Sequence, residues 1–173
     1  MITETERLII REYTEGDLAA LYEMLSDKET MCHYPKPYDE KGARRWLDWC
    51  LKSYKENGFG LWALESKQTG EFLGDCGISL QKIDGVWLPE IGYHLHKRHW
   101  HKGYGKEAAR AVRDWAFINT DYATLYSYMT VGNIASYSTA ASVGMKRIKQ
   151  YADDSGEELY VYAITREEWQ GLK

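Results

Sequence analysis

The middle of the chain, from Phe59 to Leu95, constrains the fold most, because it has the pattern of three successive strands joined by tight turns. The strand-like runs are residues 59–65, 72–80 and 86–95, with turn residues at 68–70 and at Asp84-Gly85. Short connections of this kind join neighbouring antiparallel strands. This stretch therefore predicts an antiparallel meander.

Helical spacing of apolar residues marks the segments around the meander. We expect helices from about Leu18, from about Asp39 to Asn57, from Gly103 to Ile118 and from about Asn133 to Val143. Further strands are expected at 7–13, 123–130, 145–151 and 159–165. The sum is an α+β fold, a mixed and mostly antiparallel sheet of about six or seven strands with helices on both faces. Residues 1–173 are expected to form a single domain, since no linker or repeat divides them.

Composition and charge argue against several classes of protein. The net charge of −4 and the pI near 5.8 do not suit a nucleic-acid partner, which requires a basic face. No apolar run approaches the roughly 18 residues of a membrane span and the start is not a secretory signal, so we expect no membrane partner and a cytoplasmic location. Cys32, Cys50 and Cys76 form no C-x-x-C pair, which is typical of a reducing compartment.

The segment from Glu90 to Ala109 combines a strand, a basic turn, two glycines and a helix start. Glycines allow backbone conformations that expose successive N–H groups, and a helix N-terminus adds unpaired donors and partial positive charge. Gly103-Tyr104-Gly105 is therefore a candidate phosphate site, although the same residues also fit a simple tight turn. It matches neither the dinucleotide fingerprint nor a Walker loop. Four basic side chains can add charge: Lys97, Arg98, Lys102 and Lys106.

Four histidines in the same segment, at positions 94, 96, 99 and 101, raise the question of a metal site, since imidazole is a common metal ligand. They alternate along a strand and a turn, and no cluster of cysteines or carboxylates accompanies them. We therefore expect no metal.

The turn also resembles a family motif. Residues 98–105 (RHWHKGYG) are similar to the acetyl-CoA motif Q/R-x-x-G-x-G/A of the GNAT superfamily of N-acetyltransferases. Residues 100–108 (WHKGYGKEA) resemble the W-x-K-G-Y-x-x-E-A form of its ribosomal-protein-alanine N-acetyltransferase branch. Three further segments resemble this branch: residues 5–11 with Asp17, residues 90–95, and residues 133–136 with Gly144-Met145. The resemblance therefore covers nearly the whole chain. Trp100 stands where many members have Gln or Arg, a departure common in this branch.

The resemblance implies the GNAT fold with acetyl-CoA as cosubstrate. The backbone of residues 98–105 would bind the CoA pyrophosphate, Leu95 and His96 would lie beside the pantetheine, and Asn133 and Ser136 would lie near the CoA arm. From the residues alone, Asn133 can also be an N-cap and Ser136 a polar residue on the helix surface. The expected cofactor-binding set is Leu95, His96, Arg98, His101, Lys102, Gly103, Tyr104, Gly105, Lys106, Asn133 and Ser136.

Direct attack on a thioester requires a neutral amine, so a base must remove a proton from the acceptor. The resemblance implies Glu90 for this base, whereas an exposed strand-end carboxylate is the alternative interpretation. Glu107 is less favoured, because its charge complements the first turn of a helix. A backbone N–H near Leu95 or His96 is expected to stabilise the tetrahedral intermediate.

The leaving thiolate poses a separate question. Many superfamily members protonate it with a tyrosine seven residues after the helix-start Asn, but that position is Ala140 here. Ser136 and Tyr137 lie on the same helical stripe and are the candidate acids, Ser136 first. Alternatively no acid is needed, because a thiolate is a tolerable leaving group.

The expected acceptor is a primary amine, either a protein N-terminus or a small molecule. Aromatic residues in 31–38, with Trp46 and Trp49, suit a cationic amine, although both tryptophans also fit a core. Two other interpretations stay open, a non-catalytic CoA-binding sensor on the same fold and a nucleotide-phosphate or peptide-binding module. The chain is expected to be a monomer or a homodimer paired through an exposed strand edge.

Overall fold

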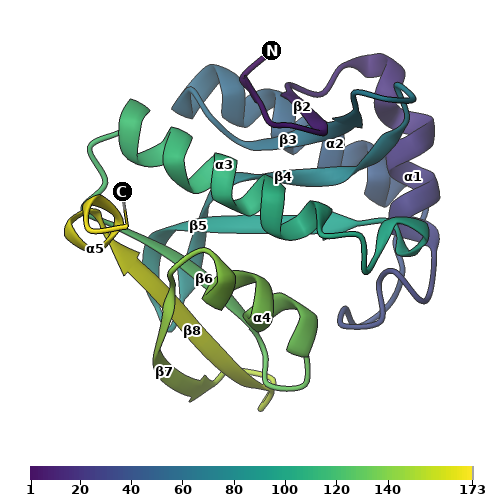
Figure 1. Ribbon diagram of the computed structural model, residues 1–173. Helices are drawn as coiled ribbons and strands as arrows, with labels where there is room; N and C mark the ends of the chain where they lie inside the picture. The colour runs from purple at the N-terminus through teal and green to yellow at the C-terminus, as the bar shows by residue number, and fades with distance from the viewer. Residues whose placement is uncertain (173) are drawn as a thin grey trace.

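The computed structural model describes residues 1–172 and is shown in Figure 1. Its strands are β1 (Thr3–Glu4), β2 (Leu8–Arg11), β3 (Leu61–Ser66), β4 (Phe72–Ile83), β5 (Val86–Leu95), β6 (Thr124–Thr130), β7 (Lys146–Ala152) and β8 (Glu158–Thr165). Its helices are α1 (Leu18–Ser26), α2 (Glu40–Asn57), α3 (Tyr104–Asn119), α4 (Ile134–Ser142) and α5 (Arg166–Gln170), with short 3-10 turns at Glu15–Asp17 and Lys97–His99.

All these strands belong to one sheet, in the order β1-β2-β3-β4-β5-β6-β8-β7. Neighbouring strands are antiparallel except β5 and β6, which are parallel. The predicted α+β class with a mixed, mostly antiparallel sheet is confirmed, but the sheet has eight strands rather than the expected six or seven. The additional strand is β1, whose two residues are too few to show an alternating pattern.

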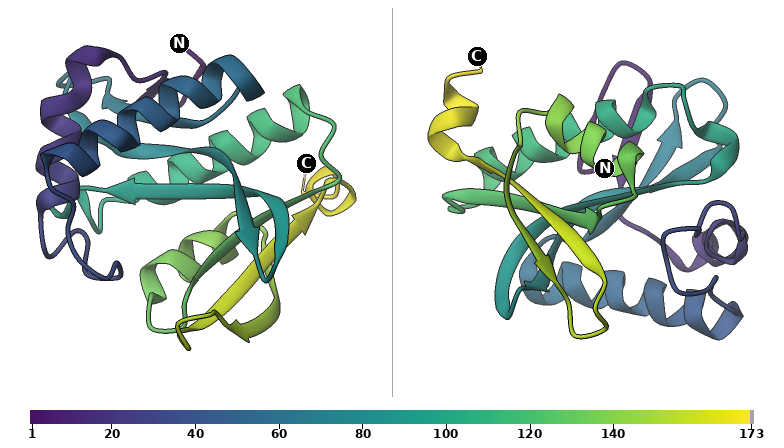
Figure 2. Two further views of the ribbon diagram at one scale, coloured as in Figure 1. Left: turned by 180° about the vertical axis from the view of Figure 1, so that it is seen from behind. Right: turned by 90° about the horizontal axis from the view of Figure 1, so that it is seen from below.

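Helices cover both faces of the sheet, as the sequence predicts. Seen from below in Figure 2, α1 and α2 lie on one side of the sheet, and α3 and α4 lie on the other. The core beneath α1 and α2 contains Leu21 and Leu47, and the core beneath α3 contains Val112 and Phe117, all of them buried. No helix among the described residues is long and apolar enough to cross a membrane.

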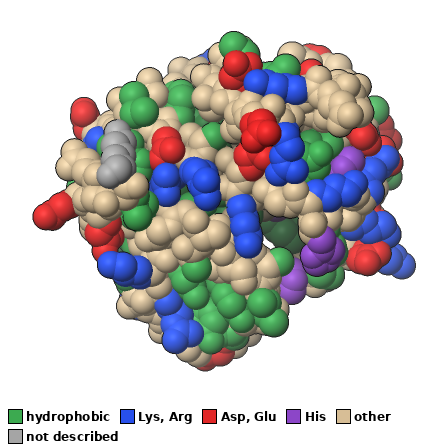
Figure 3. Space-filling model, viewed as in Figure 1, with side chains coloured by type: hydrophobic (Ala, Val, Ile, Leu, Met, Phe, Trp, Pro, Cys, Tyr) green, Lys and Arg blue, Asp and Glu red, His purple; other side chains and the backbone are tan. Residues whose placement is uncertain are grey.

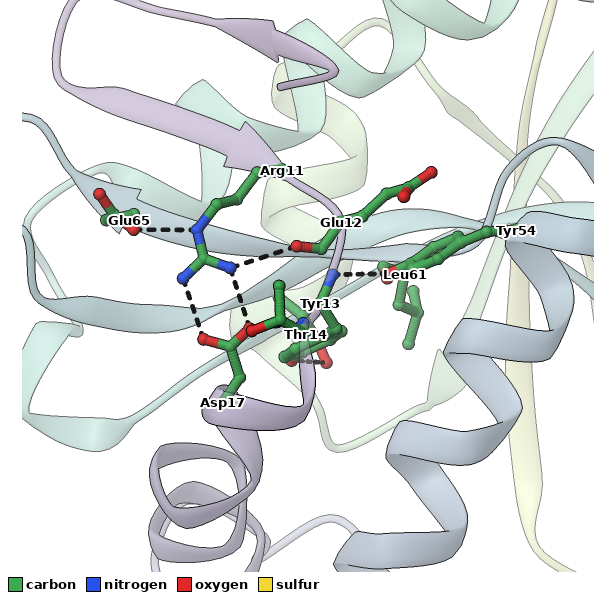
Figure 4. A network of polar contacts seen from close by, with 9 residues as sticks. Arg11, Glu12, Tyr13, Thr14, Asp17, Tyr54, Leu61 and Glu65 are labelled. Atoms are coloured by element: carbon green, nitrogen blue, oxygen red, sulfur yellow. Dashed lines mark hydrogen bonds and ion pairs between the residues drawn. The ribbon is translucent and has the colours of Figure 1, made fainter.

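An ion-pair network joins the end of β2 to β3 and to the start of α1 (Figure 4). Arg11 donates to Asp17 and to Glu65, each at 2.9 Å. Asp17 also accepts from the Thr14 N–H and forms a capping box with it. Burial would raise the pKa of Asp17, but the hydrogen bonds from Arg11 and Thr14 outweigh burial and lower it. The network fixes the chain on either side of Tyr13, whose ring is buried next to β4.

The sheet opens between β5 and β6. Their parallel ladder has a single aligned pair, Glu90 with Tyr126, whereas β5 is paired along its whole length with β4 on its other edge. Beyond Glu90 the two strands separate, and residues 91–95 of β5 and 127–130 of β6 line the same cleft. The opening exposes the edge of β5 just before the glycine-containing turn.

Candidate active site

A cleft of about 1150 Å³ begins where β5 and β6 separate and continues from the start of α3 to α2. One part is lined by the turn before α3 and by α4, and the other by α2 and the loop that precedes it. In Figure 3 the surface is hollowed at this place, with histidine and basic side chains at the rim. The cleft therefore has room for two ligands that meet beside β5.

The turn before α3 has the backbone of an anion site. His101 and Gly103 both have positive φ, 60° and 81°, and Gly103 is the N-cap of α3. The first N–H groups of a helix have no partner within the helix and carry partial positive charge. A Cβ at Gly105 would meet only ordinary contacts, the nearest at 3.6 Å, so packing within the protein does not require glycine there. Both glycines line the cleft, which fits the close approach of a phosphate-bearing cosubstrate.

Most of the residues expected to bind CoA line this cleft, and three do not. The lining members are Leu95, His101, Gly103, Tyr104, Gly105, Lys106, Asn133 and Ser136. His96 is buried, and its Nδ1 accepts hydrogen bonds from Arg98. The Arg98 side chain pairs with Glu23 and Glu71, away from the turn. Lys102 is exposed, and its carbonyl accepts from Arg7.

The first turn of α3 is attached to the N-terminal strands. Glu107 accepts from the Thr5 hydroxyl at 2.5 Å and from the Arg7 backbone N–H at 3.0 Å, and it pairs with the Arg7 guanidinium. Burial would raise the pKa of Glu107, but these donors outweigh burial and lower it. The Arg7 guanidinium also lies 4.4 Å from the centre of the Tyr104 ring. Glu107 thus attaches the first turn of α3 to the segment between β1 and β2.

Glu90 lies in the middle of β5, not at its start, and its carboxylate faces the cleft. The Ser79 hydroxyl, opposite it on β4, donates to it at 3.2 Å. Burial raises the pKa of Glu90 to about 7, and His94 and Ser79 offset part of that rise. A carboxylate with such a pKa can accept a proton near neutral pH, which is the requirement for a general base.

The two candidate acids on α4 have different surroundings. Ser136 lines the cleft, and its hydroxyl donates to the Tyr93 hydroxyl at 3.4 Å. Tyr93 in turn donates to the Ser136 carbonyl at 2.6 Å. Tyr137 is not among the lining residues, because its ring packs against Tyr160 and Tyr162. The structure therefore brings Ser136 into the cleft and leaves Tyr137 outside it.

Sequence reasoning missed a polar chain on the other side of the cleft. The fully buried Asp75 lies 2.6 Å from His94 Nδ1, and His94 Nε2 lies 2.6 Å from the Tyr34 hydroxyl. Burial opposes protonation of His94, but the Asp75 charge outweighs burial and raises the pKa of the imidazole. Trp46 and Trp49, which also fitted a core, both line the cleft here. Among the described residues, no three His, Cys, Asp or Glu side chains form a group that could hold a metal ion.

A mixed sheet that opens beside a glycine-bearing helix start defines a class, the acetyl-CoA-dependent acetyltransferases that the sequence resembles. A family model described as acetyltransferase (GNAT) domain matches residues 7–146. The uncharacterized protein YkkB of Bacillus subtilis is 38% identical over 142 residues, which cover 82% of this chain and 83% of the relative.

Solved structures agree with this class. An acetyltransferase from Agrobacterium tumefaciens str. C58 is 28% identical with a TM-score of 0.80, covering 94% of this chain and 92% of that chain. A spermidine N-acetyltransferase from Vibrio cholerae, solved with CoA and spermine, has a TM-score of 0.76 at 14% identity, covering 96% and 99%, and so shares the fold. The chain belongs to the GNAT acetyltransferase family. It is an acetyl-transferring enzyme.

Proposed function

We propose that residues 1–173 form one catalytic domain that transfers an acetyl group from acetyl-CoA to a primary amine by direct attack in a ternary complex. The observation that carries the proposal is the position of Glu90, which faces the cleft beside the point where β5 and β6 separate. Donor and acceptor can approach this point from opposite faces of the sheet. Side chains alternate along β5, so Glu90 and Tyr93 face opposite sides, and the hydroxyl of Tyr93 contacts α4.

The cosubstrate would be held by the turn before α3. The backbone around Gly103 and Gly105 would bind the pyrophosphate, with Lys106 adding positive charge at the cleft. Leu95, Asn133 and Ser136 would line the path of the pantetheine arm. The buried or paired side chains of His96 and Arg98 would support the turn without touching the cosubstrate.

In the transfer step the amine nitrogen bonds to the thioester carbon and the carbon–sulfur bond breaks. From ammonium to amide the nitrogen loses two protons, and Glu90 would accept them one at a time, passing the first to cleft water before it takes the second. The His96 N–H already donates to the Leu73 carbonyl at 3.1 Å. Because successive N–H groups of a strand point to opposite edges, the Leu95 N–H points to the open edge and would stabilise the oxyanion. Ser136 would give its hydroxyl proton to the thiolate and regain a proton from cleft water, so that the net products are the amide, the CoA thiol and one proton released to water.

The acceptor is proposed only by class. The ribosomal-protein-alanine branch, which residues 100–108 resemble, makes a protein N-terminus one candidate, and a small-molecule amine is the other. We also propose that the enzyme acts in the cytoplasm as a monomer or a homodimer, which agrees with its three free cysteines.

Two measurements test the function. Thermal shift with acetyl-CoA, CoA, ATP and NAD should show stabilisation by the two CoA ligands alone, by about 2.7 kcal/mol at a hundredfold excess over Kd. Release of CoA thiol should then be followed with a panel of n-alkylamines, polyamines, aminoglycosides and short peptides. Binding of CoA without transfer to any amine would favour the non-catalytic sensor. Stabilisation by ATP or NAD instead would contradict the cosubstrate assignment.

A further inference from the structure

The chain Asp75–His94–Tyr34 leads from a buried anion to a hydroxyl at the cleft surface. Asp75 is completely buried, His94 and Tyr34 both line the cleft, and both links between them are 2.6 Å long. The residues come from β4, β5 and the loop between α1 and α2. Such a chain can control which atoms Tyr34 presents to a ligand.

When His94 is neutral, the surroundings of Asp75 set the direction of each hydrogen bond. Its Oδ2 accepts from the Tyr13 hydroxyl at 2.8 Å and from Trp46 Nε1 at 3.2 Å, and an indole nitrogen only donates. An ionised carboxylate only accepts, so His94 Nδ1 donates to Oδ1. The Nε2 of a neutral imidazole is then an acceptor, so the Tyr34 hydroxyl donates to it. The Tyr34 oxygen is left with lone pairs and no proton to offer to the cleft.

The neighbouring cleft surface suits a cation. The rings of Tyr34, Tyr38, Trp46 and Trp49 form a continuous series of edge-to-face contacts, with centroids 6.3, 5.6 and 6.1 Å apart, and all four line the cleft. Aromatic faces attract cations. The Glu90 carboxylate lies on the same face of β5 as His94. An anion, a lone pair and aromatic faces therefore meet in one place.

We propose that this part of the cleft binds the acceptor as a cationic primary amine, and that Tyr34 Oη accepts a hydrogen bond from one of its N–H groups. His94 and Asp75 are then positioning residues that keep the Tyr34 oxygen an acceptor. The inference rests on the proposed function and adds the group that orients the amine. The ammonium gives one proton to Glu90 and keeps a hydrogen bond to Tyr34, so no proton passes through the chain itself. A bound cation also repels a protonated imidazole and so favours the neutral His94 that the chain requires.

Tyr34→Phe tests the hydroxyl and retains the ring. With CoA present, binding of n-butylammonium is compared by calorimetry with binding of n-butyltrimethylammonium, which has the same charge and no N–H. The wild-type protein should prefer the primary ammonium by at least about tenfold. Tyr34→Phe should reduce that preference about tenfold and leave the Kd of CoA unchanged, because only the hydrogen bond to Tyr34 is lost while Glu90 stays. The matched control Tyr22→Phe, on exposed α1 surface, should alter neither. A wild-type protein without the preference, or a Tyr34→Phe variant that keeps it, would overturn the proposal.

Asp75→Asn tests the direction of the chain. Tyr13 and Trp46 both donate to Oδ2, so the amide oxygen occupies that position and the amide NH₂ faces His94. His94 Nδ1 must then accept, its proton moves to Nε2, and the Tyr34 hydroxyl turns its proton toward the cleft. Nitrogen NMR should show the changed imidazole tautomer, together with loss of the primary-ammonium preference. The changed tautomer with the preference retained would refute the role of His94. If Asp75→Asn does not fold, the binding comparison with Tyr34→Phe tests the proposal by itself.

These outcomes are separate from those of the proposed function. A wild-type protein that prefers the primary ammonium but acetylates no amine would refute the transfer and leave the amine site standing. Conversely, two results would refute the amine site alone, each with acetylation of amines intact. Either the wild-type protein binds the primary ammonium no better than the quaternary one, or Tyr34→Phe keeps the full preference.

Discussion

Glu90→Gln should make the protein more stable and much less active. The pKa of Glu90 rises from an ordinary 4.5 to about 7 in the folded state, mainly because of burial. The folded protein then holds this proton more tightly than the unfolded chain does, so its contribution to stability falls as the pH rises from about 4.5 to about 7. Glutamine has nearly the same shape and no proton to lose, and it removes this penalty.

The magnitude follows from the two pKa values. A rise from 4.5 to about 7 corresponds to about 3 kcal/mol above neutral pH. Because Glu90 keeps some contact with cleft water, we expect about 2 kcal/mol, or roughly 4–8 °C in Tm for a chain of this size. The gain should be small near pH 5, grow with pH and level off above neutral pH. Loss of a general base should lower kcat/KM about 10²- to 10⁴-fold.

Thermal unfolding between about pH 5 and pH 9 measures the gain in stability. The loss of activity is measured as kcat/KM for the best amine of the panel over the same pH range. Glu12→Gln is the matched control, since the Glu12 side chain is exposed and points away from the ion pairs in Figure 4. In the wild-type protein kcat/KM should rise with pH through an apparent pKa near 7. A variant less stable than the wild type at high pH would refute the burial argument. Unchanged activity and pH profile would show that Glu90 is not the base.

Three further variants test other parts of the site. Gly103→Val places a β-branched side chain at a φ of 81°, so the Kd of CoA in calorimetry should rise at least about tenfold; an unchanged Kd would mean that the turn does not hold CoA. Glu107→Gln should cost roughly 1 kcal/mol at neutral pH with kcat/KM intact. Because the pKa of Glu107 is lowered, its carboxylate stabilises the fold above the ordinary pKa of 4.5, and this stabilisation is lost as the pH falls below it. A Tm difference between wild type and variant that persists in acid would contradict this role. Ser136→Ala should lower kcat about tenfold in CoA-release assays, whereas Tyr137→Phe should not; equal effects would remove Ser136 as the acid.

Much of the fold was predictable because its signals are local. Asp39 and Gly58 cap α2 at the expected ends, Asn133 caps α4, and Asp84-Gly85 forms the expected turn with φ of 46° and 82°. The turn before α3 and the start of that helix were predictable for the same reason, since the glycines and the helix start are adjacent in the sequence. The two-residue strand β1 gave no such signal.

The acceptor side of the cleft was only partly accessible to sequence reasoning. Counting outward from the Asp84-Gly85 turn pairs Ser79 with Glu90 and Asp75 with His94, so the register could have brought these four side chains together. No comparable rule predicts the contact of Tyr34 with His94, because it depends on how the loop after α1 packs against the sheet. The hydrogen bond of Trp46 to Asp75 is likewise a tertiary contact that no local pattern predicts.

The two sides of the cleft therefore differ in how the sequence encodes them. The proposed donor side is mostly one continuous segment, the end of β5 and the start of α3, so a short motif is enough to predict it. The proposed acceptor side is held together by a single buried carboxylate, because Asp75 accepts from the turn before α1, from α2 and from β5. Removing one partner of such a buried charge costs about 3–5 kcal/mol. If this is the acceptor site, we expect specificity to change through Tyr34, Tyr38 or Trp49, which line the cleft without a hydrogen bond to Asp75, while Asp75 itself has to remain.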